Sequence, residues 1–318
     1  VYPFVGASKV RVGENSTTVF YTAQATYSDT NVNTSSLSYS ISGGVDKSKF
    51  SIDSSSGGIA FLSPPDFENE GDSNKDNEYN LVISVSNGSD SFKQELIVQV
   101  VKKMPLAIIR VNFSNRVLPS TEEEWSDFVF KAEKLGQVNH YFDEVSGGRF
   151  AFVPAIETDG INNNGILTAN ISENSVEFAQ PDVDKFSEKS PTNLLAIFNG
   201  IEQALDLTDS NIDYSTYDTN EDGYLSFDEL QIIFVFAGAS AGFPPTAHCF
   251  HDREVKKDGV ILFPCGDISN DPMGKYALFT EDTSIKNVTI SNAVQQLAHA
   301  ALNLPLLNSL GDAFTMSS

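Results

Sequence analysis

The sequence predicts a multidomain chain in which an all-β domain over residues 1–103 precedes an α/β domain over residues 104–318. The first observation is length, because 318 residues exceed the roughly 250 at which a single hydrophobic core usually stops growing. The second is a series of short alternating apolar runs, separated by Gly-rich and Asn-rich turns, before residue 103. The third is a change beyond Leu106, where longer apolar runs alternate with helical patterns.

The first domain is expected to be a β-sandwich. Its strands follow from alternation of apolar and polar residues, which places alternate side chains on one buried face. The expected strands cover residues 19–23, 37–41, 81–85 and 95–101. Two lysines and Pro105 follow the last of them, so we expect the domain boundary there.

The second domain begins with the apolar run 106–113, which predicts a strand buried on both faces. Ser120 and Glu123 have the spacing of a capping box, so they predict a helix that runs through Phe130. The remaining elements in chain order are a helix over 137–145, a strand over 149–153, a helix over 192–207, a strand over 230–236 and a helix over about 291–302.

Composition narrows the function classes. The chain has 43 acidic and 20 basic side chains and a formal charge of -23, which argues against a general affinity for nucleic acid or anionic membranes. The same charge favours cationic partners, and calcium above all, because calcium takes carboxylate and carbonyl oxygens. No apolar run reaches the roughly 18 residues of a spanning helix, so we expect no membrane span. A composition low in Lys and rich in Asn, Ser, Thr and Asp suits a secreted or cell-surface protein.

The two cysteines, Cys249 and Cys265, both lie in the second domain. In a secreted protein they predict one local disulfide, and in a reducing compartment two buried thiols. A zinc site with His248 and His251 has permissible ligand types, but the disulfide is the simpler interpretation.

The strongest local motif is the acidic loop, residues 218–229. It carries oxygen side chains at loop positions 1, 3, 5, 9 and 12, with Gly223 at position 6 for the sharp turn. This pattern predicts a calcium site whose ligands are Asp218, Asn220, Asp222, the Tyr224 carbonyl and Glu229. The alternative is a turn that is merely rich in Asn and Asp. The residues that follow are β-branched and aromatic, so we expect the loop to lead into a strand and the ion to act as a structural clamp.

The first domain resembles bacterial cadherin-like repeats over about 90 residues. The motifs that carry the resemblance are Phe50–Asp53, Gly57–Phe61, Asp66–Glu68, Asp72, Asp76–Tyr79 and Ser86–Gly88. The resemblance implies a second calcium ion held by Glu14, Asp66 and Glu68. The chain departs from the family pattern at Tyr27 and Asn87 and has no acidic linker after the last strand, so a solvated acidic rim is the alternative.

The second domain resembles the immune inhibitor A-like family of secreted zinc metallopeptidases, which implies a zincin-like α/β fold. The resemblance rests on residues 111–113, 138–150, 212–218 and 234–238. Members of that family carry H-E-x-x-H on a later helix, where two His bind zinc and the Glu activates water.

The corresponding helix of this chain lacks those residues. The degenerate site comprises Gln295, Gln296, His299 and Leu306, so at most one His remains and no carboxylate base is present. An amide is a poor zinc ligand, and a lone His on an apolar helix is more often a core residue. We therefore expect a pseudopeptidase without zinc.

These observations predict a calcium-binding, non-catalytic bacterial extracellular protein used for binding, adhesion or display. The expected partners are calcium and a cell-surface protein or glycan. The rival interpretation is an active secreted zinc metallopeptidase with unorthodox ligands. The final residues resemble the middle of a peptidase domain, so we expect the natural protein to continue beyond Ser318.

Overall fold

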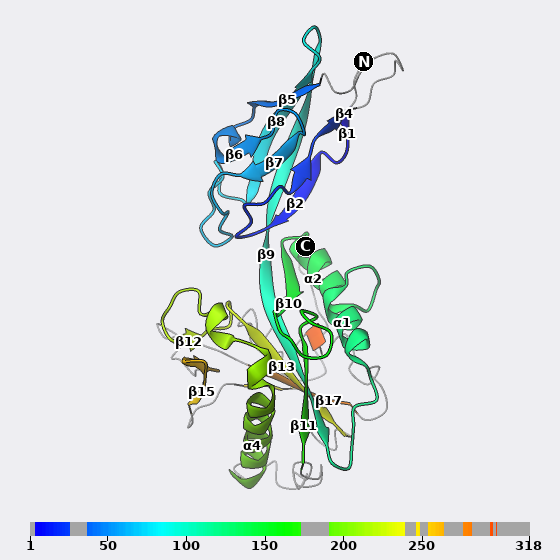
Figure 1. Cartoon of the computed structure of the whole chain (residues 1–318), viewed down its shortest axis with the longest axis vertical. Coiled ribbons are helices and arrows are strands. Elements are labelled where there is room, and N and C mark those ends of the chain that lie inside the picture. The colour runs from blue at the N-terminus through cyan, green and yellow to red at the C-terminus, as the bar shows by residue number, and fades with distance from the viewer. Residues whose placement is uncertain are drawn as a thin grey trace, which may run out of the picture. The chain divides into compact units, whose positions relative to one another are not determined.

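The computed structural model describes residues 4–25, 37–172, 191–238, 246–248, 254–263, 276–281 and residues 293, 294 and 297. Their contacts form two compact units, shown in Figure 1. The first unit is Val1–Lys103 together with Asp143–Ala151, and the second is Met104–Phe142 together with Phe152–Ser318.

The first unit is a β-sandwich, as the sequence predicts. One sheet has the order β5 (Ser38–Gly43), β8 (Glu78–Ser86), β9 (Ser91–Phe113) and β2 (Lys9–Gly13). The other has the order β3 (Tyr21–Thr22), β7 (Gly58–Phe61) and β6 (Phe50–Ile52). A short pair, β1 (Phe4–Val5) with β4 (Gln24–Ala25), and a 3-10 turn, η2 (Lys47–Lys49), complete it. The expected strand 19–23 is therefore shorter than predicted.

Alternation along the strands builds the core of the sandwich. Leu96 and Val98 of β9 and Ile83 of β8 are fully buried, and they face Ile59 and Phe61 of the second sheet in one apolar cluster. Burying a side chain of this size stabilises the fold by about 1.5–3 kcal/mol. Polar residues at alternating positions of the same strands, such as Asn80 and Glu95, are exposed, because successive side chains of a strand point to opposite faces.

β9 corrects the prediction of two separate strands. It runs without a break from Ser91 to Phe113 and contains Pro105, and the two contact units divide within it. The Lys102 N–H donates to the Arg149 carbonyl and the Lys103 N–H to the Glu14 carboxylate, so successive N–H groups face opposite sides. The Pro105 nitrogen lies on the Lys103 side, just before the β13 pairing that begins at Leu106. A proline there removes no ladder hydrogen bond.

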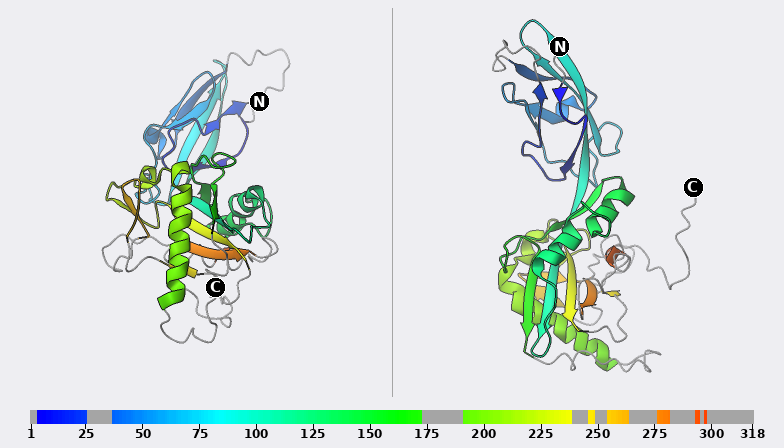
Figure 2. Two further views of the ribbon diagram at one scale, coloured as in Figure 1. Left: turned by 60° about the horizontal axis from the view of Figure 1, so that its bottom comes forward. Right: turned by 90° about the vertical axis from the view of Figure 1, so that its right-hand side faces the viewer.

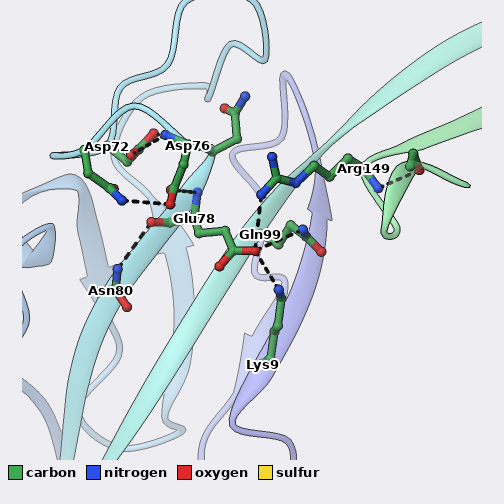
Figure 3. A network of polar contacts seen from close by, with 10 residues as sticks. Lys9, Asp72, Asp76, Glu78, Asn80, Gln99 and Arg149 are labelled. Atoms are coloured by element: carbon green, nitrogen blue, oxygen red, sulfur yellow. Dashed lines mark hydrogen bonds and ion pairs between the residues drawn. The ribbon is translucent and has the colours of Figure 1, made fainter. Parts of the chain in front are cut away.

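The segment Asp143–Ala151 belongs to the first unit by its contacts, although the sequence places it in the second domain. Arg11 pairs with Asp143 at 2.6 Å, and Arg149 lies 3.7 Å from the Glu78 carboxylate. The same Glu78 oxygen accepts from Lys9 at 2.6 Å and from Gln99 at 3.2 Å, as Figure 3 shows. One acidic side chain therefore collects three donors from three different segments.

The second unit has a mixed sheet with the order β14, β17, β13, β9 and β11. Its strands are β14 (Thr246–His248), β17 (Tyr276–Glu281), β13 (Gln231–Ala237) and β11 (Ile166–Ile171). β17, β13, β9 and β11 pair in parallel, and β14 pairs antiparallel with β17. β10 (Phe150–Pro154) also pairs with β9. Every residue of β13 is buried, which accounts for its continuous apolar sequence.

Helices α1 (Glu122–Phe130), α2 (Val138–Ser146) and α4 (Pro191–Thr208) accompany the sheet, and α4 packs against β11. Figure 2 shows α4 running along the sheet. The α/β character of this part is thus observed. No helix within the described residues has both the length and the apolar character needed to cross a membrane.

The capping box of α1 differs by one residue from the prediction. Thr121 is the N-cap and Glu124 its partner, in place of Ser120 and Glu123. Ser120 is occupied elsewhere, because its N–H and hydroxyl donate to Glu281 at 3.1 and 2.5 Å.

Glu281 ends β17 and is completely buried. Besides the two donors of Ser120, it accepts from the Trp125 indole N–H at 3.1 Å. The Arg110 guanidinium donates to the Ser120 carbonyl and interacts electrostatically with Glu281. A buried carboxylate with this many donors holds the start of α1 on the end of β17.

We expect Glu281→Ala to lower the free energy of unfolding of the second unit by about 3 kcal/mol, because buried donors of Ser120 and Trp125 lose their acceptor. Trp125 is the only tryptophan and is buried, so urea unfolding followed by its fluorescence measures this unit. The exposed Glu123→Ala is the matched control and should change stability by less than about 0.5 kcal/mol. Equal effects of the two variants would contradict a structural role for Glu281.

Candidate metal centres

The acidic loop begins on a firmly anchored segment. After α4 come two 3-10 turns, η4 (Asp209–Asn211) and η5 (Tyr214–Tyr217). Tyr214 is fully buried, and the Tyr217 hydroxyl accepts from the Ile156 N–H at 2.6 Å. Burial raises the pKa of both tyrosines, so their hydroxyls stay protonated near neutral pH. These aromatic side chains fix the position of Asp218, the first loop residue.

The structure brings the side-chain oxygens of Asp218 and Asn220 together at the backbone of Asp222. The Asp222 N–H donates to the side-chain oxygens of both Asp218, at 3.1 Å, and Asn220, at 3.0 Å. The Gly223 N–H donates to the second Asp218 oxygen at 3.0 Å. Glu221 and Gly223 have φ of 59° and 85°, the left-handed conformation that such a sharp turn requires. The loop therefore winds around the Asp218 carboxylate, and its donor set is the hard oxygen type that calcium prefers.

Glu229 closes the loop through hydrogen bonds to the chain itself. One of its oxygens accepts from the Thr219 N–H at 2.9 Å, and the other from the Ser226 N–H and hydroxyl at 3.0 and 2.7 Å. The carboxylates of Asp218, Asp222 and Glu229 do not form a group in which ligand oxygens all lie within 4.8 Å of one another. The loop leads into β13, so the predicted strand after it is confirmed.

A hairpin of β15 (Val255–Lys257) and β16 (Val260–Leu262) supports this loop. β12 (Tyr224–Leu225) pairs in parallel with β16, and the Asp258 carboxylate accepts from the Tyr214 N–H at 2.9 Å. Lys257 pairs with Asp206 of α4 at 2.6 Å. This hairpin is not among the elements predicted from the sequence, although Asp-Gly at residues 258–259 is a strong hairpin signal.

Glu14, Asp66 and Glu68 do come together. Their carboxylate oxygens lie within 4.8 Å of one another, and among the described residues this is the only group of three acidic, His or Cys side chains that does so. Glu14 follows β2, and the other two lie in the loop after β7.

Lys102, on β9, contacts two acids of this carboxylate cluster, and no sequence motif pointed to it. Its ammonium lies 2.5 Å from Glu68 and 3.8 Å from Glu14. Burial raises the pKa of Glu14, while Lys102 and backbone N–H groups oppose the rise. An ammonium and a calcium ion require the same carboxylate oxygens, so Glu14 and Glu68 cannot hold a calcium ion while Lys102 contacts them. The second calcium ion that the resemblance implies therefore stays a prediction.

The remaining predicted site residues, Gln295, Gln296, His299, Leu306, Cys249 and Cys265, lie outside the described residues. Near the degenerate peptidase motif, Ala293, Val294 and Leu297 are helical and buried. The disulfide and the lack of a peptidase centre therefore stay predictions.

Comparison with known proteins identifies the first unit. Residues 8–101 match the model of the cadherin domain family. Residues 8–101 form a cadherin domain. This assignment suggests an extracellular role in adhesion or binding, and cadherin domains in general bind calcium. The family match ends at residue 101, and no curated protein matches the chain.

Solved cadherins are similar to this cadherin domain. The human protocadherin-24 EC1-2 structure is 18% identical, with a TM-score of 0.27, and the match covers 38% of this chain and 55% of that chain. The Drosophila N-cadherin EC1-3 structure is 19% identical, with a TM-score of 0.26, and the match covers 37% of this chain and 41% of that chain. The protocadherin gammaB7 EC3-6 cis-dimer structure is 24% identical, with a TM-score of 0.27, and the match covers 31% of this chain and 23% of that chain. This chain thus spans between about a quarter and about half of these solved chains.

The hydrogen bonds of Glu229 generate a prediction that does not depend on calcium. In calcium-free buffer, Glu229→Ala should destabilise the second unit by about 2 kcal/mol, because donors of Thr219 and Ser226 lose a buried acceptor. Urea unfolding followed by Trp125 fluorescence measures the change. Glu221→Ala, at an exposed position of the same loop with the same left-handed backbone, should have little effect. A stable Glu229→Ala variant in calcium-free buffer would show that these bonds contribute nothing.

Proposed function

We propose that this chain is a calcium-binding, non-catalytic extracellular protein that serves in binding, adhesion or display. The observation that carries the extracellular binding or adhesion role is the cadherin domain at residues 8–101. The calcium-binding part of the proposal rests on the acidic loop of the second unit. The proposed partners are calcium and a cell-surface protein or glycan, and the proposed location is secreted or cell-surface. The acidic charge of -23 supports a cationic partner over nucleic acid.

The proposed calcium site is the acidic loop of the second unit. The side-chain oxygens of Asp218 and Asn220 both accept from the Asp222 N–H, so they lie close together. The pattern of the loop adds the Asp222 and Glu229 carboxylates and the Tyr224 carbonyl as ligands. In this proposal the ion clamps a segment that lies between α4 and the buried strand β13. Its role is structural, because the loop continues into a sheet strand that is buried along its whole length.

The second unit is proposed to be a zincin-like scaffold without peptidase activity. Support comes from its resemblance to secreted metallopeptidases together with the degenerate residues Gln295, Gln296, His299 and Leu306. Metal-assisted hydrolysis needs an ion with protein ligands and a base that takes a proton from water. Amide and apolar side chains supply neither, and a similar fold does not by itself provide the chemistry.

Calcium should raise the melting temperature of the second unit. At a concentration about a hundred times its dissociation constant, a ligand adds about 2.7 kcal/mol of stability. We expect Asp222→Ala to abolish most of the difference between melting curves recorded with calcium and with chelator, followed by Trp125 fluorescence. Glu221→Ala, on the exposed side of the loop, should keep the difference. Identical curves for the unmodified protein with calcium and with chelator would refute the loop as a calcium site.

The unmodified protein should not cleave casein and should contain no stoichiometric zinc. Loss of a general base alone typically lowers a rate by about 10²–10⁴-fold. Elemental analysis of the purified protein, combined with a casein assay with and without chelator, tests both statements. Stoichiometric zinc together with chelator-sensitive cleavage that copurifies through two columns would favour the active metallopeptidase instead.

A further inference from the structure

Lys102 occupies a constrained place at one end of the cadherin domain. Its backbone N–H donates to the Arg149 carbonyl, so the strand fixes its Cα. Its side chain is only 14% exposed, and its ammonium contacts Glu68 at 2.5 Å and Glu14 at 3.8 Å. A lysine buried to this extent requires compensating carboxylates, which these two residues supply.

Two of the three carboxylates, those of Asp66 and Glu14, are held by backbone N–H groups. One Asp66 oxygen accepts from the N–H of Glu68 at 3.0 Å and of Asn69 at 3.1 Å. The Glu14 side chain, only 9% exposed, accepts from the Lys103 N–H at 3.0 Å. The fold therefore orients Asp66 and Glu14 through backbone N–H groups, whereas the more exposed Glu68 carboxylate contacts Lys102.

We propose that the Lys102 ammonium is the resident cation of the Glu14–Asp66–Glu68 cluster, so that this end of the cadherin domain is assembled without calcium. The ammonium is tethered to β9, so its local concentration does not depend on the medium and its binding costs little translational entropy. Calcium could bind these acids only by displacing the ammonium. This inference concerns the first unit and does not depend on the acidic loop.

The competition predicts that removing the ammonium creates a calcium response. Lys102→Met keeps the length and apolar stem of the side chain and removes its charge. In an Asp222→Ala background, which removes the contribution of the loop, Lys102→Met should gain calcium affinity by about tenfold or more. Adding Glu14→Gln should remove the gain, and the neighbouring Lys103→Met should not produce it. Lys102→Arg should behave like the unmodified chain.

Isothermal titration of the full chain with calcium chloride, together with melting curves from circular dichroism, measures these responses. If Lys102→Met folds only in calcium and not in chelator, the proposal is supported, because calcium then replaces the ammonium. Three results would overturn it. The first is that Asp222→Ala still binds calcium and that adding Glu14→Gln abolishes this binding. The second is that Lys102→Met folds but shows no gain in calcium affinity. The third is that Lys102→Met fails to fold both with calcium and without it. A failure of the acidic loop to bind calcium would instead appear as an unmodified chain indistinguishable from Asp222→Ala.

Discussion

The backbone of β9 between Leu106 and Phe113 is the constraint on which the second unit depends. Its residues are almost entirely buried, so each N–H and carbonyl needs a protein partner. β13 supplies partners along Leu106–Val111 on one side, and β11 supplies them along Ile108–Phe113 on the other. Because β13 must hold this register, the end of the acidic loop that precedes it is fixed as well. The helix α4 covers the face of β11, and the segment after α4 leads to the loop.

The chain is strongly acidic, and its buried carboxylates are satisfied mainly by the backbone. Asp46 accepts from the N–H groups of Ser73 and Asn80, and Glu157 from those of Asp159 and Asn164. Burial still raises the pKa of Glu157, so its ionised form costs stability at neutral pH, and that cost falls as pH drops through the raised pKa. Glu229 is held in the same way, by N–H groups of the acidic loop.

The two acidic centres differ in what balances their charge. In the acidic loop, the contacts described for the carboxylates of Asp218 and Asp222 are with backbone N–H groups, which are uncharged and leave the negative charge unbalanced. In the cluster of the cadherin domain, a lysine ammonium is already present.

Local sequence determined the features that depend on neighbours along the chain. Alternation predicted the sandwich, and the apolar run predicted the central strand. The loop spacing brought the side chains of Asp218 and Asn220 to the Asp222 N–H, since turn geometry acts over a few residues. Tertiary structure alone decided the rest. Thr121, and not Ser120, is the N-cap of α1, because the N–H and hydroxyl of Ser120 donate to Glu281, 161 positions away. Lys102 entered the carboxylate cluster because β2 and β9 pair side by side and place Glu14 next to it. Such contacts join residues that no periodicity relates, so only the folded chain brings them together.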